Sequence, residues 1–570
     1  MDLKDRKINA KFNVLAIICI ILFCFAVSPV SLQNDTFYTI KIGEYITQNG
    51  IDMQDHFSWH KDLAYTYPHW AYDTGIYLIY HLGEITQIPN GGMLLVYIST
   101  VILACVLGIV IYLTTKKISK DNLISFLFTL VAMYLLKDFI AARAQLVTFI
   151  LFVLTILFIE KFLESNKKRY LVYLVLIAII IANVHVAVWP FFFVLFMPYI
   201  GEYIIACIIE SNIIYKIKLY ISKKKIDILE KKSLKEKNED AKKIIEQKIV
   251  ESKKEFELKK QEEEKKLEKA KQRRENPYKI SVKKNKAVKW IILVMVICVF
   301  TGLLTPLKDT PYTYLIKTMQ GNTTKSISEH QPLTLFNNIN MMVSFALVIG
   351  ILIFTKLKVS LKDLFMVGGL MFLTFMSRRQ ASIFVLMVIP IFAKWVAELF
   401  ETYDKGGTKK FAQLMQTWAG KIVTVLIIII CCLAIWAPNK NEKFVDDTKY
   451  PVEASNWILN NLDVENIRIY NEYNYGSYLL FKGIPVFIDS RADLYAPEFN
   501  KTEEKEGRDI FSDYINISSI NLYYEDKFEE YDITHVVVLK RSKLNMFLSR
   551  NKDYKELYKD DKFVIYERNI

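Results

Sequence analysis

An aspartate stands directly after the first long apolar run of the sequence, in the stretch Asn34-Asp35-Thr36-Phe37-Tyr38. A carboxylate held where water meets hydrocarbon is suited to act as a general base on a hydroxyl or amine acceptor. A simpler interpretation is that Asp35 caps a helix, since carboxylates are common at helix starts. The pattern makes Asp35 the first candidate catalytic residue, and Asp73 is a second carboxylate candidate.

Two histidine patterns offer further chemistry. His185 closes a predicted apolar span and could assist proton transfer or hydrogen-bond a substrate, although a structural histidine is the simpler interpretation. His56 and His60 have the i,i+4 spacing of a metal-binding pair and follow the acidic residues of 52–55, but the pattern places no third ligand. We therefore expect no metal and no other cofactor; a divalent cation is supported by this spacing alone.

A membrane bundle must position these residues. Hydrophobic residues make up 52% of the 570-residue chain although its net charge is +14. They gather into runs of roughly 17–22 residues with almost no charge, which is the length that crosses a bilayer. The sequence predicts an α-helical polytopic membrane protein with about eleven spans and a C-terminal extracytoplasmic α/β domain. The predicted spans are 12–30, 93–114, 122–136, 144–162, 170–183, 187–208, 289–305, 340–356, 362–376, 381–399 and 421–437.

Lysine and arginine set the predicted orientation. The N-terminal segment, the turns at 116–120 and 160–169, and the segment 222–289 are basic and fall on one face, which is therefore cytoplasmic. The opposite face receives the loop 31–92, where seven carboxylates stand against two lysines, and the C-terminal tail. We expect a multi-pass cell-membrane protein with a cytoplasmic N-terminus and an extracytoplasmic C-terminal domain.

Soluble pieces interrupt the spans and divide the chain. The residue pattern of the first external loop, in stretches such as FYTIKIGEYIT and YDTGIYLIYHL, predicts amphipathic helices that lie along the membrane surface. The insert contains 25 Lys/Arg and 14 Asp/Glu, which predicts one charged helix or a helical hairpin, with heptads too broken to define a coiled coil. The tail alternates strand-like IRIYNEY, PVFIDS, THVVVLK and KFVIYER with helical VEASNWILNN and SKLNMFLSR. The predicted regions are 1–221 (membrane, with loop 31–92), 222–289 (cytoplasmic insert), 290–437 (membrane) and 438–570 (α/β domain).

The first loop resembles that of the GT-C superfamily of membrane glycosyltransferases, such as the lipid A aminoarabinose transferases and the protein O-mannosyltransferases. The shared order is a span, an Asp, aromatic residues, an amphipathic helix ending Asn-Gly, a Trp/Tyr/His-rich turn and a second amphipathic helix ending Leu-Gly. It is carried here by Asp35 to Ile40, Asn49-Gly50 and Tyr67-Pro68-His69-Trp70 through Gly83. Other stretches look like poorly characterised bacterial membrane proteins of the same type: Arg143-Ala144-Gln145, Ala182-Asn183-Val184-His185, Ser377-Arg378-Arg379-Gln380, Tyr473-Asn474-Tyr475-Gly476 and Ile488-Asp489-Ser490-Arg491.

The resemblance implies a GT-C-like enzyme that moves a sugar from a polyprenyl-phosphate-linked donor to a glycan, lipid or protein acceptor at the extracytoplasmic face. Asp35 matches the residue that acts as base. Many relatives carry a second acidic residue directly after it, where this chain has Thr36, and a lysine in the later turn, which is absent here. Metal coordination by an acidic pair and phosphate binding by that lysine therefore lack their usual residues.

A lipid phosphate would need cations on the outer side, where they are uncommon. The candidates for this contact are Arg143, Arg378, Arg379 and Lys308. Arginine suits the task because its planar fork of donors matches a phosphate. The alternative is that these arginines snorkel to the interface or pair with Glu329 or Asp138.

Further side chains are candidates for substrate contact. Aromatic residues of the first loop could stack on a sugar, although anchoring at the membrane interface explains them equally well. In the tail, strand ends could carry ligands, and a salt-bridged turn from Asp489 to Arg491 is the simpler interpretation. The candidates are Tyr38, His69, Trp70, Asn183, Asn474, Asp489 and Arg491.

Other functions fit parts of the sequence. A non-enzymatic transporter or flippase of lipid-linked saccharide could use the same arginines, but no paired inverted repeats and few polar mid-span residues are present. A membrane scaffold could recruit a cytoplasmic partner through 222–289. Nucleic acid is not an expected partner, because the insert contributes +11 of the net charge and lies near the cytoplasmic leaflet, where anionic lipids are the expected counter-charge.

Overall fold

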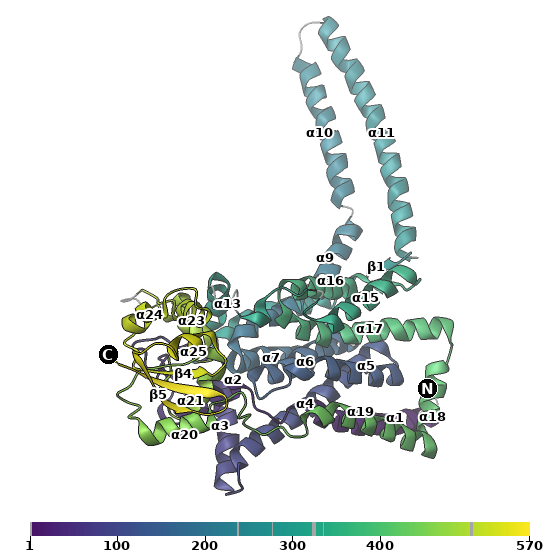
Figure 1. Ribbon diagram of the computed structural model, residues 1–570. Coiled ribbons are helices and arrows are strands. Elements are labelled where there is room, and N and C mark those ends of the chain that lie inside the picture. The colour runs from purple at the N-terminus through teal and green to yellow at the C-terminus, as the bar shows by residue number, and fades with distance from the viewer. Residues whose placement is uncertain are drawn as a thin grey trace.

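The computed structural model describes residues 3–211, 213–235, 239–275, 278–321, 327–334, 336–501 and 506–569. Apolar helices form a bundle, a long helical hairpin projects from its side, and an α/β unit packs on one end (Figure 1). The helices of the bundle are α1 (Leu3–Val27), α4 (Gly91–Ser119), α5 (Asn122–Leu135), α6 (Ala144–Ser165), α7 (Arg169–Val184), α8 (Trp189–Val194), α9 (Met197–Ser211), α12 (Val288–Val299), α15 (Ile339–Phe354), α16 (Leu361–Met376), α17 (Ala381–Tyr403) and α19 (Trp418–Trp436).

Among the described residues, six helical stretches are long and apolar enough to cross a membrane: Ala10–Val27, Gly91–Ser119, Ala144–Ser165, Val186–Glu210, Arg378–Tyr403 and Trp418–Asn439. Four shorter apolar helices accompany them, at Asn122–Leu135, Arg169–Val184, Val288–Leu303 and Ile339–Phe354. With α16, a helix occupies each of the eleven predicted ranges. The polytopic helical class is thus confirmed, whereas the count of eleven crossings stays a prediction.

Prolines shift two predicted boundaries. The first helix ends at Val27, just before Ser28-Pro29, rather than at residue 30. The span predicted at 187–208 is broken into α8 and α9, and each of these helices carries a proline in its first turn, Pro190 and Pro198. Proline has no amide hydrogen to continue a helix ladder but fits the first turn, so both sites start new helices.

The first external loop forms two helices, α2 (Asn34–Asn49) and α3 (Trp70–Ile85), that pack closely against each other. Gly43 of α2 makes this contact possible, because a Cβ there would lie 2.0 Å from the carbonyl oxygen of Asp73. On its other side α2 packs on the tail, where Phe37 stacks edge-on against Tyr450 and Tyr478 with ring centroids 5.0 and 5.1 Å apart. The loop and the tail thus share one hydrophobic core.

The tail contains a four-stranded mixed sheet in the order β3-β4-β6-β5. Strand β3 (Ile469–Tyr470) runs parallel to β4 (His535–Leu539), whereas β6 (Phe563–Arg568) is antiparallel to both β4 and β5 (Tyr554–Lys559). Its helices are α20 (Val452–Asn461), α21 (Tyr473–Phe481), α22 (Pro497–Asn500), α23 (Ile510–Ser519), α24 (Tyr524–Glu530) and α25 (Lys543–Leu548).

In the tail, one strand prediction was wrong and one strand was missed. PVFIDS is not a strand of the sheet, because its backbone turns to the first loop, where Val486 forms an isolated bridge with Ser58. Strand β5 was missed because YKELYK is polar, as befits a strand at the edge of the sheet. The predicted helices at VEASNWILNN and SKLNMFLSR correspond to α20 and α25.

The charged insert is a helical hairpin of α10 (Ile213–Lys235) and α11 (Glu239–Glu275), the second of the two forms the sequence allowed. It begins near residue 213 rather than at 222. Beyond it, the chain returns to the bundle through β1 (Ile280–Ser281), which pairs with β2 (Val359–Ser360). The remaining helices of the described residues are α13 (Thr310–Gln320) and α18 (Gly407–Gln416). The described residues also form 3-10 turns at Lys137–Phe139, Val186–Val188, Phe300–Leu303, Ser328–His330, Arg378–Gln380, Ala437–Asn439 and Ala492–Tyr495.

Candidate active site

A cavity of about 430 Å³ lies where the bundle, the first loop and the tail meet. Its walls come from the start of α2, the turn 64–69, the starts of α6 and α8, the segments 314–319, 327–330 and 373–383, and the tail from Tyr473 to Phe499. Polar groups gather around it, whereas Phe149, Phe152 and Phe191 give it an apolar side among the membrane helices. The cavity can therefore hold a molecule with both a polar head and an apolar chain.

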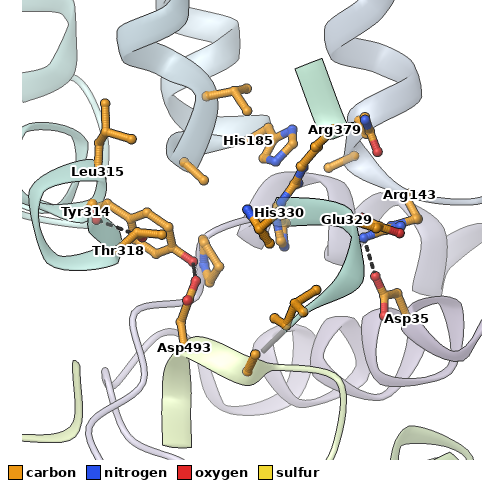
Figure 2. Close-up of a pocket in the computed structure, with 18 of the residues that line it drawn as sticks. Asp35, Arg143, His185, Tyr314, Leu315, Thr318, Glu329, His330, Arg379 and Asp493 are labelled. Carbon is orange, nitrogen blue, oxygen red and sulfur yellow. Dashed lines mark hydrogen bonds and ion pairs between the residues drawn. The ribbon is translucent and has the colours of Figure 1, made fainter. Parts of the chain in front are cut away.

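Asp35 lies in the first turn of α2 and faces this cavity. It does not cap the helix: Gln33 precedes α2, and the Asp35 carboxylate instead pairs with Arg143, Oδ2 to Nη2, at 2.5 Å. Arg143 stands at the start of α6, and Glu329 adjoins its guanidinium from a third segment (Figure 2). Arg143 thus pairs with Asp35, the predicted base, and lies near Glu329, which the sequence offered as a structural ion-pair partner.

A second arginine enters the same space. Arg379 points into the cavity beside His330 (Figure 2). The loop that carries His330 is fixed to this turn, since the amide of Arg378 donates to the Gln331 carbonyl at 3.0 Å. Burial, together with the charge of Arg379 and against that of Glu329, lowers the pKa of His330 to about 4. His330 is therefore neutral near pH 7, so arginine supplies the positive charge here.

Two histidines share one wall of the cavity. The rings of His69 and His185 meet edge-on, with centroids 4.8 Å apart. His185 Nδ1 lies 3.1 Å from the Thr148 hydroxyl. Burial lowers the pKa of His69 to about 3, helped by the charges of Arg143 and Arg379. A neutral imidazole at this position can donate or accept a hydrogen bond to a substrate but carries no charge for a phosphate.

The tail contributes another carboxylate, Asp493, to the lining of the cavity. Asp493 accepts a short hydrogen bond from the Tyr314 hydroxyl, and the pair lies across the cavity from Asp35 (Figure 2). Burial raises the pKa of Asp493 above its ordinary value, although the Tyr314 hydrogen bond and Arg379 oppose this. Asp35 and Asp493 thus stand in different electrostatic surroundings, the first against a guanidinium and the second against a phenol.

Arg491 joins the first loop to the tail beneath this wall. Its guanidinium contacts Asp55 at 2.6 Å and Asp489 at 2.7 Å, and all three side chains are at most 2% exposed. It also lies over the rings of Phe57 and Tyr65, 5.3 and 4.9 Å from their centroids. Burial alone would raise the pKa of Asp55, but the charge of Arg491 holds it below the ordinary value. The salt-bridged turn predicted from Asp489 to Arg491 is present and extends to the first loop.

The predicted residues that line the cavity are Asp35, Tyr38, His69, Arg143, His185, Arg379 and Arg491. The other candidates lie outside its lining for different reasons. Asp73 is buried between α3 and α2, Asp489 lies beneath Arg491, and Asn474 is exposed on α21.

Three further candidates also lie outside the lining. Trp70 donates its indole N–H to the Asn183 side-chain oxygen at 3.2 Å, so both tie α3 to α7 instead. Lys308 is exposed in a turn with φ of 55°. Arg378, whose neighbour Arg379 enters the cavity, is likewise not part of the lining.

The residues present do not fit a divalent-cation site. Asp35 is engaged by a guanidinium, and no three His, Cys, Asp or Glu side chains of the described residues converge as ligands. The His56–His60 spacing has other partners: His56 Nε2 lies 2.6 Å from Asp52, and His60 Nε2 lies 2.8 Å from the Phe487 carbonyl oxygen.

Sequence reasoning missed several lining residues. Tyr314 and His330 belong to a segment that carried no motif, and Glu329 was considered only as an ion-pair partner. Asp493 follows the Asp489-Ser490-Arg491 stretch by two residues, and a second acidic residue so close to that stretch was the available signal.

No family model and no curated protein matches the sequence. The structure is similar to the archaeal oligosaccharyltransferase AglB from Archaeoglobus fulgidus, solved in complex with an inhibitory peptide and a dolichol-phosphate, with a TM-score of 0.52 and 11% identity over 95% of this chain and 70% of that one. It is also similar to the Archaeoglobus fulgidus oligosaccharyltransferase tethered to an acceptor peptide that contains an NVT sequon (TM-score 0.50, 10% identity, 93% and 69% covered). Those neighbours are GT-C superfamily membrane glycosyltransferases, so the fold implied by the first-loop resemblance is confirmed.

Proposed function

We propose that this chain, which has the fold of a GT-C membrane glycosyltransferase, transfers a sugar from a polyprenyl-phosphate-linked donor to an acceptor at the extracytoplasmic face. The observation that carries the proposal is the Asp35–Arg143 pair, which opens into a cavity with both an apolar membrane side and a second arginine. A carboxylate beside cations, next to space for a lipid chain, is the set of groups that this reaction needs.

The donor fits the two sides of the cavity. Its isoprenoid chain would lie along Phe149, Phe152 and Phe191, and its phosphate would meet Arg143 and Arg379, whose planar guanidinium groups form paired hydrogen bonds to phosphate oxygens. The dolichol-phosphate bound by the structural neighbour supports a lipid phosphate as the ligand class. The acceptor, a glycan, lipid or protein, would enter beside the tail, where Tyr473 and Asp493 line the cavity.

In the proposed step, Asp35 takes the proton of an acceptor hydroxyl or amine as that group attacks the anomeric carbon. The bond between this carbon and the phosphate oxygen breaks, and its electron pair leaves with the lipid phosphate. The arginines stabilise the charge that develops on this leaving group. Because Arg143 already pairs with Asp35, a bound phosphate competes for the same guanidinium and would release the carboxylate to act as base.

The test is Asp35→Asn in the full-length protein reconstituted into vesicles with a radiolabelled polyprenyl-phosphate-linked sugar. We expect transfer to fall by roughly 10²–10⁴-fold, the usual contribution of a general base. Glu44→Gln is the matched control, because Glu44 lies on the same helix, outside the lining of the cavity, in a half-buried pair with Lys41. Undiminished transfer by folded Asp35→Asn, or donor movement across the bilayer without a new glycosidic bond, would contradict the proposal.

A further inference from the structure

The outer face of α10 carries an exposed apolar stripe. Ile217, Tyr220, Ile221 and Ile228 are between 49% and 66% exposed, although they lie on a helix of an ordered hairpin. Their spacing of three, four and seven residues places them on one side of the helix. Exposed apolar side chains gathered in this way mark a surface that binds something.

This stripe points away from the partner helix. The hairpin seam on α10 uses Leu219, Ile226 and Leu229, and Ile226 is buried there. Position 219 follows 217 by two residues, which is about 200° around a helix, so the seam and the stripe are on opposite sides. Interhelical ion pairs keep this arrangement: Lys218 with Glu263 at 3.3 Å and Lys253 with Glu230 at 2.7 Å.

The charge of the two helices differs. Helix α10 has eight lysines against Asp227 and Glu230, whereas α11 has 13 basic and 11 acidic residues. Lys224 and Lys231 fall within the apolar stripe itself, and both are exposed. The outer face of α10 is therefore both apolar and strongly basic, while α11 is nearly balanced.

The position of the hairpin brings this face to the bilayer. The span Val186–Glu210 begins at the cavity, where Ala187 and Phe191 line the wall, and leads into α10 at its other end. Figure 1 shows the hairpin running crosswise to the helices of the bundle, with α10 on the side toward the C-terminal domain and α11 on the side away from it. The outer face of α10 is thus turned toward the leaflet from which the hairpin emerges.

We infer that α10 lies flat on an anionic lipid surface at the end of the bundle opposite the cavity. Its isoleucines and Tyr220 enter the headgroup boundary, and the lysines around them contact lipid phosphates through long side chains that reach to the interface. Helix α11 packs on the side of α10 that faces away from the lipid and is exposed to water. Because the membrane span that precedes α10 in the chain already holds it near the bilayer, an apolar stripe and its lysines are enough to keep it there, and each lysine near such a surface adds about 1 kcal/mol.

Lysine acylation of the full-length protein in single-copy nanodiscs tests this inference. We expect Lys224 and Lys231 to react about fivefold more slowly in discs with phosphatidylglycerol than in purely zwitterionic discs, which corresponds to about 1 kcal/mol per lysine. Lys254 and Lys265, which the helical repeat places on the far side of α11 and which are exposed, serve as internal controls and should react equally in both. Equal rates at Lys224 and Lys231 in the two lipids would overturn the inference.

A pair of variants separates lipid binding from other causes. Ile221→Glu with Ile228→Glu should remove the protection of Lys224, whereas Ile244→Glu with Val250→Glu, at exposed positions of α11, should keep it. Protection that appears only when two copies share a disc, and does not depend on lipid charge, would show that the stripe binds a second copy of the chain instead.

Discussion

The proposed base is held by an arginine before any substrate arrives. Asp35 contacts Arg143 at 2.5 Å, and its side chain is 18% exposed, so the pair is partly open to the cavity. An ion pair of this kind keeps the carboxylate oriented toward the cavity. In the proposed mechanism the donor phosphate binds the guanidinium of Arg143, so arrival of the donor would weaken the Asp35–Arg143 pair and free the carboxylate.

Replacing Arg491 is expected to loosen the junction between the first loop and the tail. Arg491→Met leaves Asp55 and Asp489 buried without their cation, and breaking a buried pair costs about 3–5 kcal/mol. The measurement is the thermal denaturation midpoint of the purified protein in detergent, which should fall. Substituting Asp55→Asn and Asp489→Asn together with Arg491→Met should recover most of the loss, because no buried charge remains; a loss unchanged in the triple variant would contradict this explanation.

Asp73 predicts a pH effect on stability. Burial raises its pKa well above the ordinary value, and a hydrogen bond from the Thr39 side chain and the charge of Arg491 oppose this only in part. The folded state therefore holds this proton more tightly than the unfolded state, so its contribution to stability is lost as pH rises above about 4. Asp73→Asn should gain stability relative to the wild type between pH 5 and pH 8. The denaturation midpoints of both proteins are measured at each pH, with Glu44→Gln, a half-buried carboxylate of α2, as the control. A difference between Asp73→Asn and wild type that does not change with pH would refute this explanation.

At the scale of elements, the first loop rather than the bundle organises the site. Helix α2 carries Asp35 on one side and packs Phe37 into the core of the tail on another. The turn 64–69 then brings His69 to the wall of the cavity beside His185. Helices α2 and α3 pack between the membrane bundle and the α/β unit. This packing explains why groups more than 400 residues apart in sequence meet around one cavity.

Removing the hairpin is expected to leave transfer intact. The described residues of 213–275 contribute nothing to the lining of the cavity, and the chain on either side of the hairpin is joined by an ion pair between Lys284 and Glu210 at 2.6 Å. A variant in which a short Gly/Ser linker replaces 213–275 should therefore keep kcat near the wild-type value in the vesicle assay. A large fall in kcat with normal folding would show that the hairpin takes part in turnover.

At the scale of the whole molecule, the cavity and the hairpin base mark opposite ends of the span Val186–Glu210. If the basic segments are cytoplasmic, a membrane-impermeant lysine reagent applied to intact cells should modify Lys552 and Lys555 of the tail and spare Lys254 of α11. Permeabilised cells provide the control in which all three are modified. Modification of Lys254 alone in intact cells would reverse the proposed orientation.

The sequence determined the membrane class, the helix ranges and the motif at Asp35, because these depend on properties of contiguous residues. Apolar runs of sufficient length favour membrane helices wherever they occur, and a motif keeps its spacing in any fold. The same local reasoning failed at PVFIDS, whose β-prone composition could not reveal that its backbone partner is the first loop rather than the sheet.

Only the tertiary structure decided which charges meet. The sequence offered Glu329 or Asp138 as partners of Arg143, whereas packing of α2 against the start of α6 brought Asp35 to it, with Glu329 beside them. It likewise separated Arg379 from Arg378 and brought in Tyr314 and Asp493, which no motif had marked. Contacts between distant segments depend on how helices pack and where a tail docks, and these are properties of the folded chain rather than of any stretch within it.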